Sequence, residues 1–271
     1  MLHTGDVTNW GWLAPDQYAK ASAAAAAIQS AGLPYAWTIG NHDTRAVGWD
    51  GRPGSTGYGG SAYQDNPECP SRLGAAACHS WLLVRHTEEY NAAFNAFRYT
   101  RIAGAYRSGK VDNIYSTFTA AGKKWMVVTL ELWPRPEVIN WAKQVVAANP
   151  SYNVTVLTHH YLDGNGSISS SSGGYGATSP RYLFDNLIKV YPNIKMVLSG
   201  HTGDHARRTD TGNAGNKIVS YLGNFGSVTT NPTRLLEFNV PAGTITDRVY
   251  APYTNSTISQ PYATTGMNFV G

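Results

Sequence analysis

Four short apolar segments of this 271-residue chain each run directly into polar residues of the kinds that bind metal ions. The residues that follow them are Gly5-Asp6, Gly40-Asn41-His42-Asp43, His159-His160 and Gly200-His201. Carboxylate, carboxamide and imidazole groups without a thiolate favour Zn, Mn, Fe or Co over Cu(I). Two such ions about 3.5–4 Å apart can hold both the attacking and the leaving oxygen of a phosphoryl displacement. The residue types therefore indicate metal-assisted hydrolysis.

The spacing of these groups predicts that they converge. Ligands of open α/β sheets bind beyond the carboxyl ends of the strands, and a Gly at a strand end permits the tight turn needed there. If the four apolar segments are neighbouring strands of one sheet, that edge gathers Asp6, Asn41, His159 and His201. We expect these four side chains to bind the metal.

His42 has a different expected role. It lies between Asn41 and Asp43, a placement that suits a histidine beside the substrate that is not itself a ligand, with its ring held by the Asp43 carboxylate. We therefore expect His42 and Asp43 to take part in the reaction rather than bind metal.

The elements that position these groups alternate between strands and helices and then become strands alone. Apolar residues at helical spacing predict helices over residues 15–31, 88–97, 136–148 and 180–191. Apolar runs predict strands over residues 35–39, 124–131, 153–158, 194–199, 217–225, 234–240 and 244–251. This order is typical of a layered α/β domain. Two long loops, residues 44–80 and 163–179, each follow a candidate ligand group, so we expect them to lie beside the site and set substrate choice.

Composition excludes several classes of protein. Charged residues make up 14% of the chain and apolar residues 42%, so it can form a sizeable core and is not a charge-rich disordered chain. The net charge is +4, but Lys and Arg are scattered, so we expect no specific nucleic-acid binding. The longest apolar run, residues 23–28, is far shorter than the roughly 20 residues of a membrane span. The low charge and the Gly-rich, aromatic loops favour a secreted or extracytoplasmic protein.

Two cysteines, Cys69 and Cys78, lie in a stretch rich in Gly and Pro. A disulfide between them would close a short loop and add roughly 2–3 kcal/mol of stability by the loop-entropy model. The alternative is a pair of free thiols, whereas zinc binding does not fit, because the gap is longer than in zinc sites. We favour the disulfide.

The motifs of this chain, taken in order, resemble those of the calcineurin-like metallophosphoesterases. They are Gly5-Asp6, Gly40-Asn41-His42-Asp43, a strand ending in His159, and Gly200-His201. The resemblance extends over nearly the whole chain, and residues 112–161 and 195–222 are similar to secreted bacterial members. It implies a single domain over residues 1–271 with two packed mixed β-sheets flanked by helices, a layered α/β/β/α sandwich. It also implies a divalent transition metal, Zn, Mn or Fe, present as one or two ions.

The resemblance implies a role for each motif residue. Asp6 would bridge two metal ions, and the shell of the second ion would be completed by Asn41, His159 and His201. A metal-bound hydroxide would attack a small or polymeric phosphate mono- or diester, and His42 would protonate the leaving group or stabilise the transition state. Further candidates for contacting the substrate or supporting the ligands are His160, Tyr161, His205 and Arg207.

Two features of the family are missing from this sequence. The family's first motif, Asp-x-His on the opening strand, precedes Gly-Asp by tens of residues, but only five residues precede Asp6. The closing Gly-His-x-His has Gly203 in place of its second histidine, and Asp204 and His205 are candidates to replace it. Both losses concern the same metal ion. We therefore expect an incomplete first metal site in a domain that is N-terminally truncated relative to the family.

Two other functions stay open at this point. A degenerate metal site would leave the chain catalytically impaired or a non-catalytic binding module, and the same metal chemistry could hydrolyse another class of ester. The sequence does not favour a serine hydrolase, because it has no Gly-x-Ser-x-Gly motif. The interpretation we favour is a metal-dependent phosphoric ester hydrolase.

Overall fold

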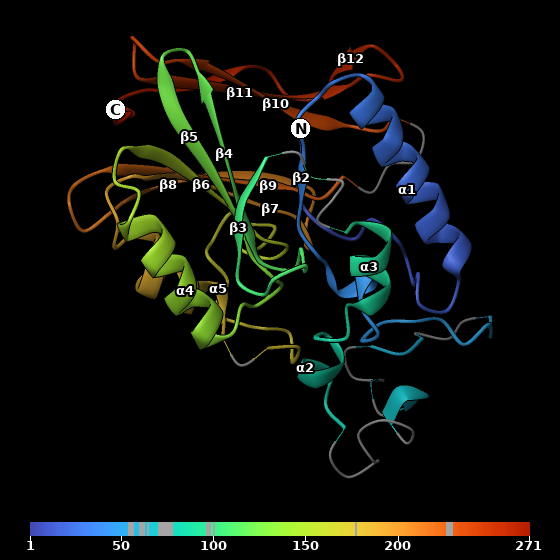
Figure 1. Ribbon diagram of the computed structural model, residues 1–271. Coiled ribbons are helices and arrows are strands. Elements are labelled where there is room, and N and C mark those ends of the chain that lie inside the picture. The colour runs from blue at the N-terminus through green and yellow to red at the C-terminus, as the bar shows by residue number, and fades with distance from the viewer. Residues whose placement is uncertain are drawn as a thin grey trace.

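The largest element of the fold is a seven-stranded mixed sheet with the strand order β3-β4-β5-β6-β7-β9-β8 (Figure 1). The computed structural model describes residues 1–53, 57–59, 63, 65–69, 78–95, 99, 101–176, 178–225 and 230–271. The strands of this sheet are β3 (Ile102–Ala105), β4 (Ile114–Ala120), β5 (Lys123–Thr129), β6 (Tyr152–Leu157), β7 (Ile194–Ser199), β8 (His205–Thr211) and β9 (Lys217–Gly223). Because β5, β6, β7 and β9 run parallel, their carboxyl ends lie along one edge.

The central strands of this sheet are apolar on both faces, so each face needs a covering layer. Helices form the layer on one face. Helix α4 (Pro136–Ala147) starts at a proline, whose missing amide costs nothing in a first turn. Its apolar face packs with the strands in the main core. Helix α5 (Pro180–Leu183) is capped by the Ser179 hydroxyl, which accepts from the Tyr182 amide, and continues into the π-helical turn η6 (Phe184–Ile188). Figure 1 shows α4 and α5 on the same side of the sheet.

A smaller antiparallel sheet packs on the opposite face. Its strands are β10 (Thr233–Asn239), β11 (Thr244–Ala251), β12 (Ser256–Thr257) and β13 (Tyr262–Thr264). Between the sheets, Leu157 and Met196 of the larger sheet share a buried cluster with Ile245 and Met267. The expected fold class, with two packed sheets and flanking helices, is therefore confirmed.

The N-terminal segment forms its own layer. Strands β1 (Leu2–His3) and β2 (Ala36–Trp37) pair in parallel as a two-stranded sheet, joined by α1 (Pro15–Ser30). Short helices α2 (Ser80–Leu83) and α3 (Glu88–Ala93) follow. The four strands that lead into the candidate ligands thus belong to two sheets, not one. The Thr38 hydroxyl bridges them by donating to the Leu130 carbonyl at 2.7 Å, which brings the end of β2 to the end of β5.

Most of the expected elements form, with differences at the edges. The predicted helix over 180–191 is divided between α5 and η6, and the predicted helix over 88–97 ends at Ala93, with residues 96–98 outside the described part. Strands β3, β4 and β8 were not predicted. The expected disulfide between Cys69 and Cys78 is present.

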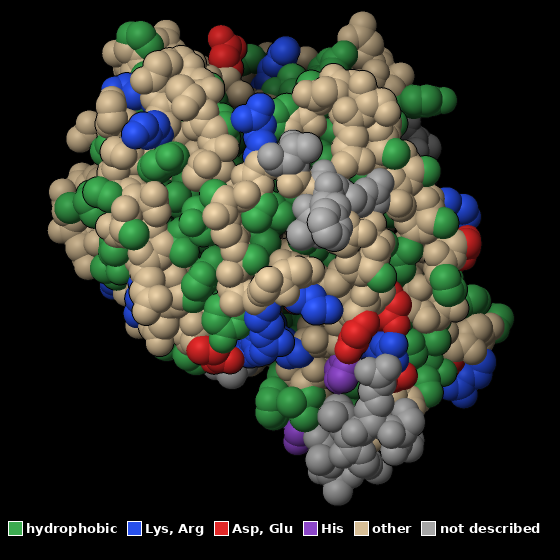
Figure 2. All heavy atoms as spheres, in the orientation of Figure 1, with side chains coloured by type: hydrophobic (Ala, Val, Ile, Leu, Met, Phe, Trp, Pro, Cys, Tyr) green, Lys and Arg blue, Asp and Glu red, His purple; other side chains and the backbone are tan. Residues whose placement is uncertain are grey.

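The surface has no continuous basic area on the face drawn in Figure 2, where Lys and Arg side chains lie at several separate places. None of the helices in the described ranges is long and apolar enough to cross a bilayer.

Candidate metal centre

Three of the predicted ligands meet at one point. Asp6 follows β1, His159 follows β6 and His201 follows β7, and one ligand atom from each lies within 4.8 Å of the others. The Nε2 atom of His159 is 3.2 Å from Asp6 Oδ2 and 3.1 Å from His201 Nδ1. A carboxylate and two imidazoles at this separation can bind one divalent transition metal ion.

A main-chain carbonyl orients the central histidine. His159 Nδ1 lies 2.5 Å from the carbonyl oxygen of Thr4. Because a carbonyl can only accept, Nδ1 carries a proton, and in the neutral ring Nε2, which faces Asp6 and His201, has the lone pair that a metal ion would take. This is the usual arrangement of a metal-binding histidine whose other nitrogen donates to the protein.

Two glycines make this close approach possible. Gly5 has φ +96°, and a Cβ there would lie 2.5 Å from His159 Nδ1. At Gly40, a Cβ would lie 2.0 Å from an Asp6 carboxylate oxygen. Any larger residue would therefore collide with a candidate ligand, which is the physical reason for the glycine in both motifs.

The charges of the three side chains are coupled. Burial alone would raise the pKa of Asp6, but the charge and hydrogen bond of His159 outweigh it and lower that pKa. Burial works against protonation of His159, yet Asp6 raises its pKa. Burial, reinforced by His159, lowers the pKa of His201 to about 3. Without a bound cation, Asp6 and His159 therefore stabilise each other's charged forms, beside a neutral His201 imidazole.

Asn41, the fourth predicted ligand, lies in the loop next to Asp6. It opens the 3-10 turn η1 (Asn41–Asp43), and the amide of the next residue, His42, donates to Asp6 Oδ1 at 3.1 Å. The Asn41 side chain is buried, and its Oδ1 has no hydrogen-bond partner among the described residues. An unpaired buried oxygen is costly, and a cation held by Asp6 and the histidines would satisfy it. The donor set thus fits a divalent metal ion.

The sequence model of one family, described as "Calcineurin-like phosphoesterase", matches residues 1–204, three quarters of the chain. This chain belongs to the calcineurin-like phosphoesterase family. Among curated proteins, it is 21% identical over 213 residues to the "Uncharacterized protein YvnB" of Bacillus subtilis (strain 168). That match covers 78% of this chain but only 13% of the relative, so the chain spans about an eighth of its length.

Two solved structures match part of this chain at low identity. The NAD nucleotidase (NadN) of Haemophilus influenzae is 12% identical, with a TM-score of 0.29, over 55% of this chain and 26% of that one. A Staphylococcus aureus protein assigned as a 5'-nucleotidase, solved with alpha-ketoglutarate, is 12% identical, with a TM-score of 0.32, over 64% of this chain and 34% of that one.

His42, the histidine of the Gly-Asn-His-Asp motif, has a hydrogen-bond partner other than the expected Asp43. Its Nδ1 lies 2.7 Å from the Asn9 carbonyl. The Asp43 carboxylate instead accepts from the amide and hydroxyl of Thr8 and from the amide of Gly40. Burial, reinforced by Asp6, raises the pKa of Asp43 to about 6. The expectation that Asp43 holds the ring of His42 is therefore wrong, and Asp43 holds together the two loops that carry Asp6 and Asn41.

The remaining predicted residues separate into two groups. His160 is buried beside the cluster, with its ring centre 4.8 Å from that of His201. Tyr161 is wholly buried in the main core, so it does not reach a substrate. Arg207 pairs with the buried Asp247 and lies over the ring of Tyr262, so it is not offered to a phosphate.

His205, a candidate for the missing second histidine, is outside the three-residue cluster. It is at the start of β8, where its Nδ1 lies 3.1 Å from Asp204 Oδ2 and its ring neighbours Phe225. The structure therefore brings neither candidate replacement, Asp204 nor His205, to the group formed by Asp6, His159 and His201.

The two loops expected to lie beside the site contact one another. The Ser80 hydroxyl donates to the Gly174 carbonyl at 2.5 Å, and Ala46, Leu132, Trp133 and Tyr175 share one buried cluster. Parts of both loops, residues 54–56, 60–62, 64, 70–77 and 177, lie outside the described residues. Trp133 belongs to this cluster and lies next to His160 and His201. No sequence motif marks it.

Proposed function

We propose that this chain hydrolyses phosphate mono- or diesters, using a divalent transition metal ion, Zn, Mn or Fe, held by Asp6, Asn41, His159 and His201. The observation that carries the proposal is the convergence of Asp6, His159 and His201 within 4.8 Å in a calcineurin-like phosphoesterase. A cation bound there would polarise a phosphoryl oxygen and lower the pKa of a water ligand to about 7.

The protein's own groups prepare this site. His159 is fixed by the Thr4 carbonyl with Nε2 toward the other ligands. His42 is fixed by the Asn9 carbonyl, which accepts a hydrogen bond from Nδ1. Its Nε2 is then left to give a proton to the departing alcohol oxygen. We assign His42 this role, and Asp43 the role of holding its loop in place.

Metal content and activity can be measured separately. Elemental analysis after dialysis against Mn²⁺ or Zn²⁺ should find at least one ion per chain, and an aryl phosphate monoester or diester should be hydrolysed. Asp6→Asn should remove most of the metal and the activity. Asp16→Asn, at an exposed carboxylate of α1 paired with Lys20, is the matched control and should change neither.

His42→Ala tests the proton transfer. Turnover should fall by about 10²-fold or more, the usual contribution of a general acid, while metal content is retained. A parallel loss of metal would show that His42 binds the ion instead. Metal binding without hydrolysis of either phosphate ester would make the chain a binding module, and hydrolysis of a carboxyl ester alone would place it in another esterase class.

The disulfide supports an extracytoplasmic location. Cys69 and Cys78 are joined, and such bonds persist in oxidising compartments and are rare in the cytosol. Thiol labelling of the protein taken directly from its host should leave both cysteines unmodified until a reductant is added. Labelling without reductant would contradict this location.

A further inference from the structure

Trp133 occupies an unusual backbone position next to the metal centre. It follows β5 in the loop between β5 and α4, is almost completely buried and has φ +44°. Left-handed φ values are uncommon for residues other than glycine and cost free energy at a bulky residue. Six of the described residues other than glycine have positive φ, and two of the others, Asp6 and His201, are candidate ligands of this centre.

The indole ring contacts two of the histidines. Its Nε1 lies 3.0 Å from His160 Nδ1, and its ring meets the rings of His160 and His201 edge to face, at 5.6 Å and 5.4 Å between centres. On its other side, Tyr175 stacks at 5.3 Å with an interplanar angle of 11°. A Cβ at Gly176 would lie 2.4 Å from Trp133 Cβ, so the ring has little room to move.

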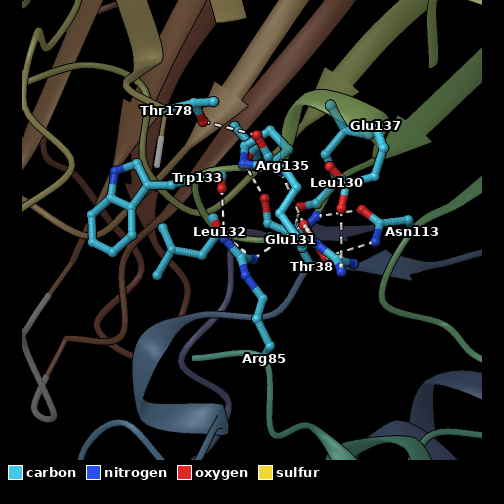
Figure 3. Close-up of polar contacts among 12 residues, drawn as sticks. Thr38, Arg85, Asn113, Leu130, Glu131, Leu132, Trp133, Arg135, Glu137 and Thr178 are labelled. Carbon is cyan, nitrogen blue, oxygen red and sulfur yellow. Dashed lines mark hydrogen bonds and ion pairs between the residues drawn. The ribbon is translucent and has the colours of Figure 1, made fainter. Parts of the chain in front are cut away.

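A buried ion network holds the backbone of Trp133. Arg85 donates to the carbonyl oxygens of Leu132 and Trp133, at 2.9 Å and 2.7 Å, and lies 3.2 Å from Glu131. Arg135 pairs with the same carboxylate at 2.9 Å. Figure 3 shows Glu131 surrounded by Arg85, Arg135 and Asn113, with the indole of Trp133 pointing away from this group. The network fixes the chain on both sides of the left-handed residue.

We propose that Trp133 is a positioning residue of the metal centre, setting the orientation of His160 by its indole N–H and that of His201 by ring packing. The proposal rests on the proposed metal-dependent function. An indole nitrogen can only donate a hydrogen bond, so His160 Nδ1 must accept and its proton is placed on Nε2. His160 packs against the candidate ligand His201, and groups that orient a ligand contribute to metal affinity although they never touch the ion.

The orientation of the His160 ring also determines the surroundings of its Nε2 atom. It is buried without a hydrogen-bond partner among the described residues, and Asp163 Oδ1 lies 3.5 Å from it. Without the indole donor, the His160 ring could rotate and form a hydrogen bond through either nitrogen. The ring of His201, whose centre is 4.8 Å from that of His160, would then no longer be packed in one orientation. Trp133 therefore makes one arrangement of the two rings the favoured one.

The test compares Trp133→Phe with Trp125→Phe. Both remove one indole N–H from a buried tryptophan, but Trp125 lies within β5, donates to the Ala120 carbonyl and packs against Phe238 and Phe269. Trp133→Gly is a second variant, because glycine adopts a positive φ without strain. Thermal unfolding of each variant confirms that it is folded before it is compared.

Two readouts decide the proposal. In metal-free protein, long-range ¹H–¹⁵N spectra should show His160 protonated on Nε2 in the unchanged chain and in Trp125→Phe, but a mixture of tautomers in both Trp133 variants. Titration with Mn²⁺ should show that the affinity of the Trp133 variants, and of no other variant, is lower by about tenfold. An unchanged tautomer or an unchanged affinity overturns the proposal. If the unchanged chain binds neither Mn²⁺ nor Zn²⁺, the proposed metal-dependent function is refuted together with the role of Trp133. If all variants bind the ion equally, only the role of Trp133 is refuted.

Discussion

Acid should destabilise the metal-free protein through His3, a partly buried histidine that is not a candidate ligand. His3 Nδ1 accepts from the Gly5 amide at 3.2 Å, and its ring packs against Trp37 at 5.4 Å between centres. A protonated ring would lose that acceptor and place a charge in a partly buried site. Burial, reinforced by the charge of His159, lowers the pKa of His3 from 6.5 to about 4.

The size and sign of the effect follow from proton linkage. Between pH 6.5 and about 4 the unfolded chain binds a proton at His3 that the folded chain does not, so the free energy of unfolding falls as the pH falls. Each pKa unit corresponds to about 1.4 kcal/mol, which makes the full loss about 3 kcal/mol. Above pH 6.5 both states are neutral at His3, and its contribution to the pH dependence disappears.

Urea unfolding with a chelator present, at several pH values from 4 to 7.5, measures this loss. His3→Gln, whose side-chain oxygen can still accept from Gly5, should remove it, so the stability difference between the unchanged chain and the variant shifts by about 3 kcal/mol across the range. His3→Ala should show the same flattening but be less stable at every pH, because the Gly5 amide loses its acceptor. A stability difference that is constant from pH 4 to 7.5 would refute the reasoning.

Three further predictions concern other parts of the protein. Glu131→Gln leaves the partly buried Arg85 without its charge partner, so the free energy of unfolding should fall by about 3 kcal/mol in urea titrations, and a loss under 1 kcal/mol would argue against the network. Cys69→Ser opens the disulfide loop and should cost roughly 2–3 kcal/mol, which calorimetry can check against the reduced protein. Removing the metal with a chelator should lower the melting temperature, since an ion at 100 times its Kd adds about 2.7 kcal/mol, and Asp6→Asn should abolish that difference.

Much of the candidate site could be predicted because its signals are local. A glycine followed by Asp, Asn or His at the end of an apolar run indicates a strand that ends at a ligand, and Asp6, His159 and His201 do meet. The parallel strands β5, β6 and β7 were recognisable as continuous apolar runs. Strand β8 was missed because its residues, 205–211, are mostly polar, and its pairing with β9 at the sheet edge is what makes it a strand.

The sequence by itself determined the chemical types at the strand ends, the helices that begin at proline and the glycines at the two close approaches. Only the tertiary structure decided which groups hold those residues: the carbonyls of Thr4 and Asn9 orient His159 and His42, Asp43 binds backbone amides instead of a histidine ring, and Tyr161 points into the core. The physical reason is range. Turn and strand preferences act between neighbours in the chain, whereas a buried hydrogen bond such as that from Trp133 to His160 depends on elements packed together across the fold.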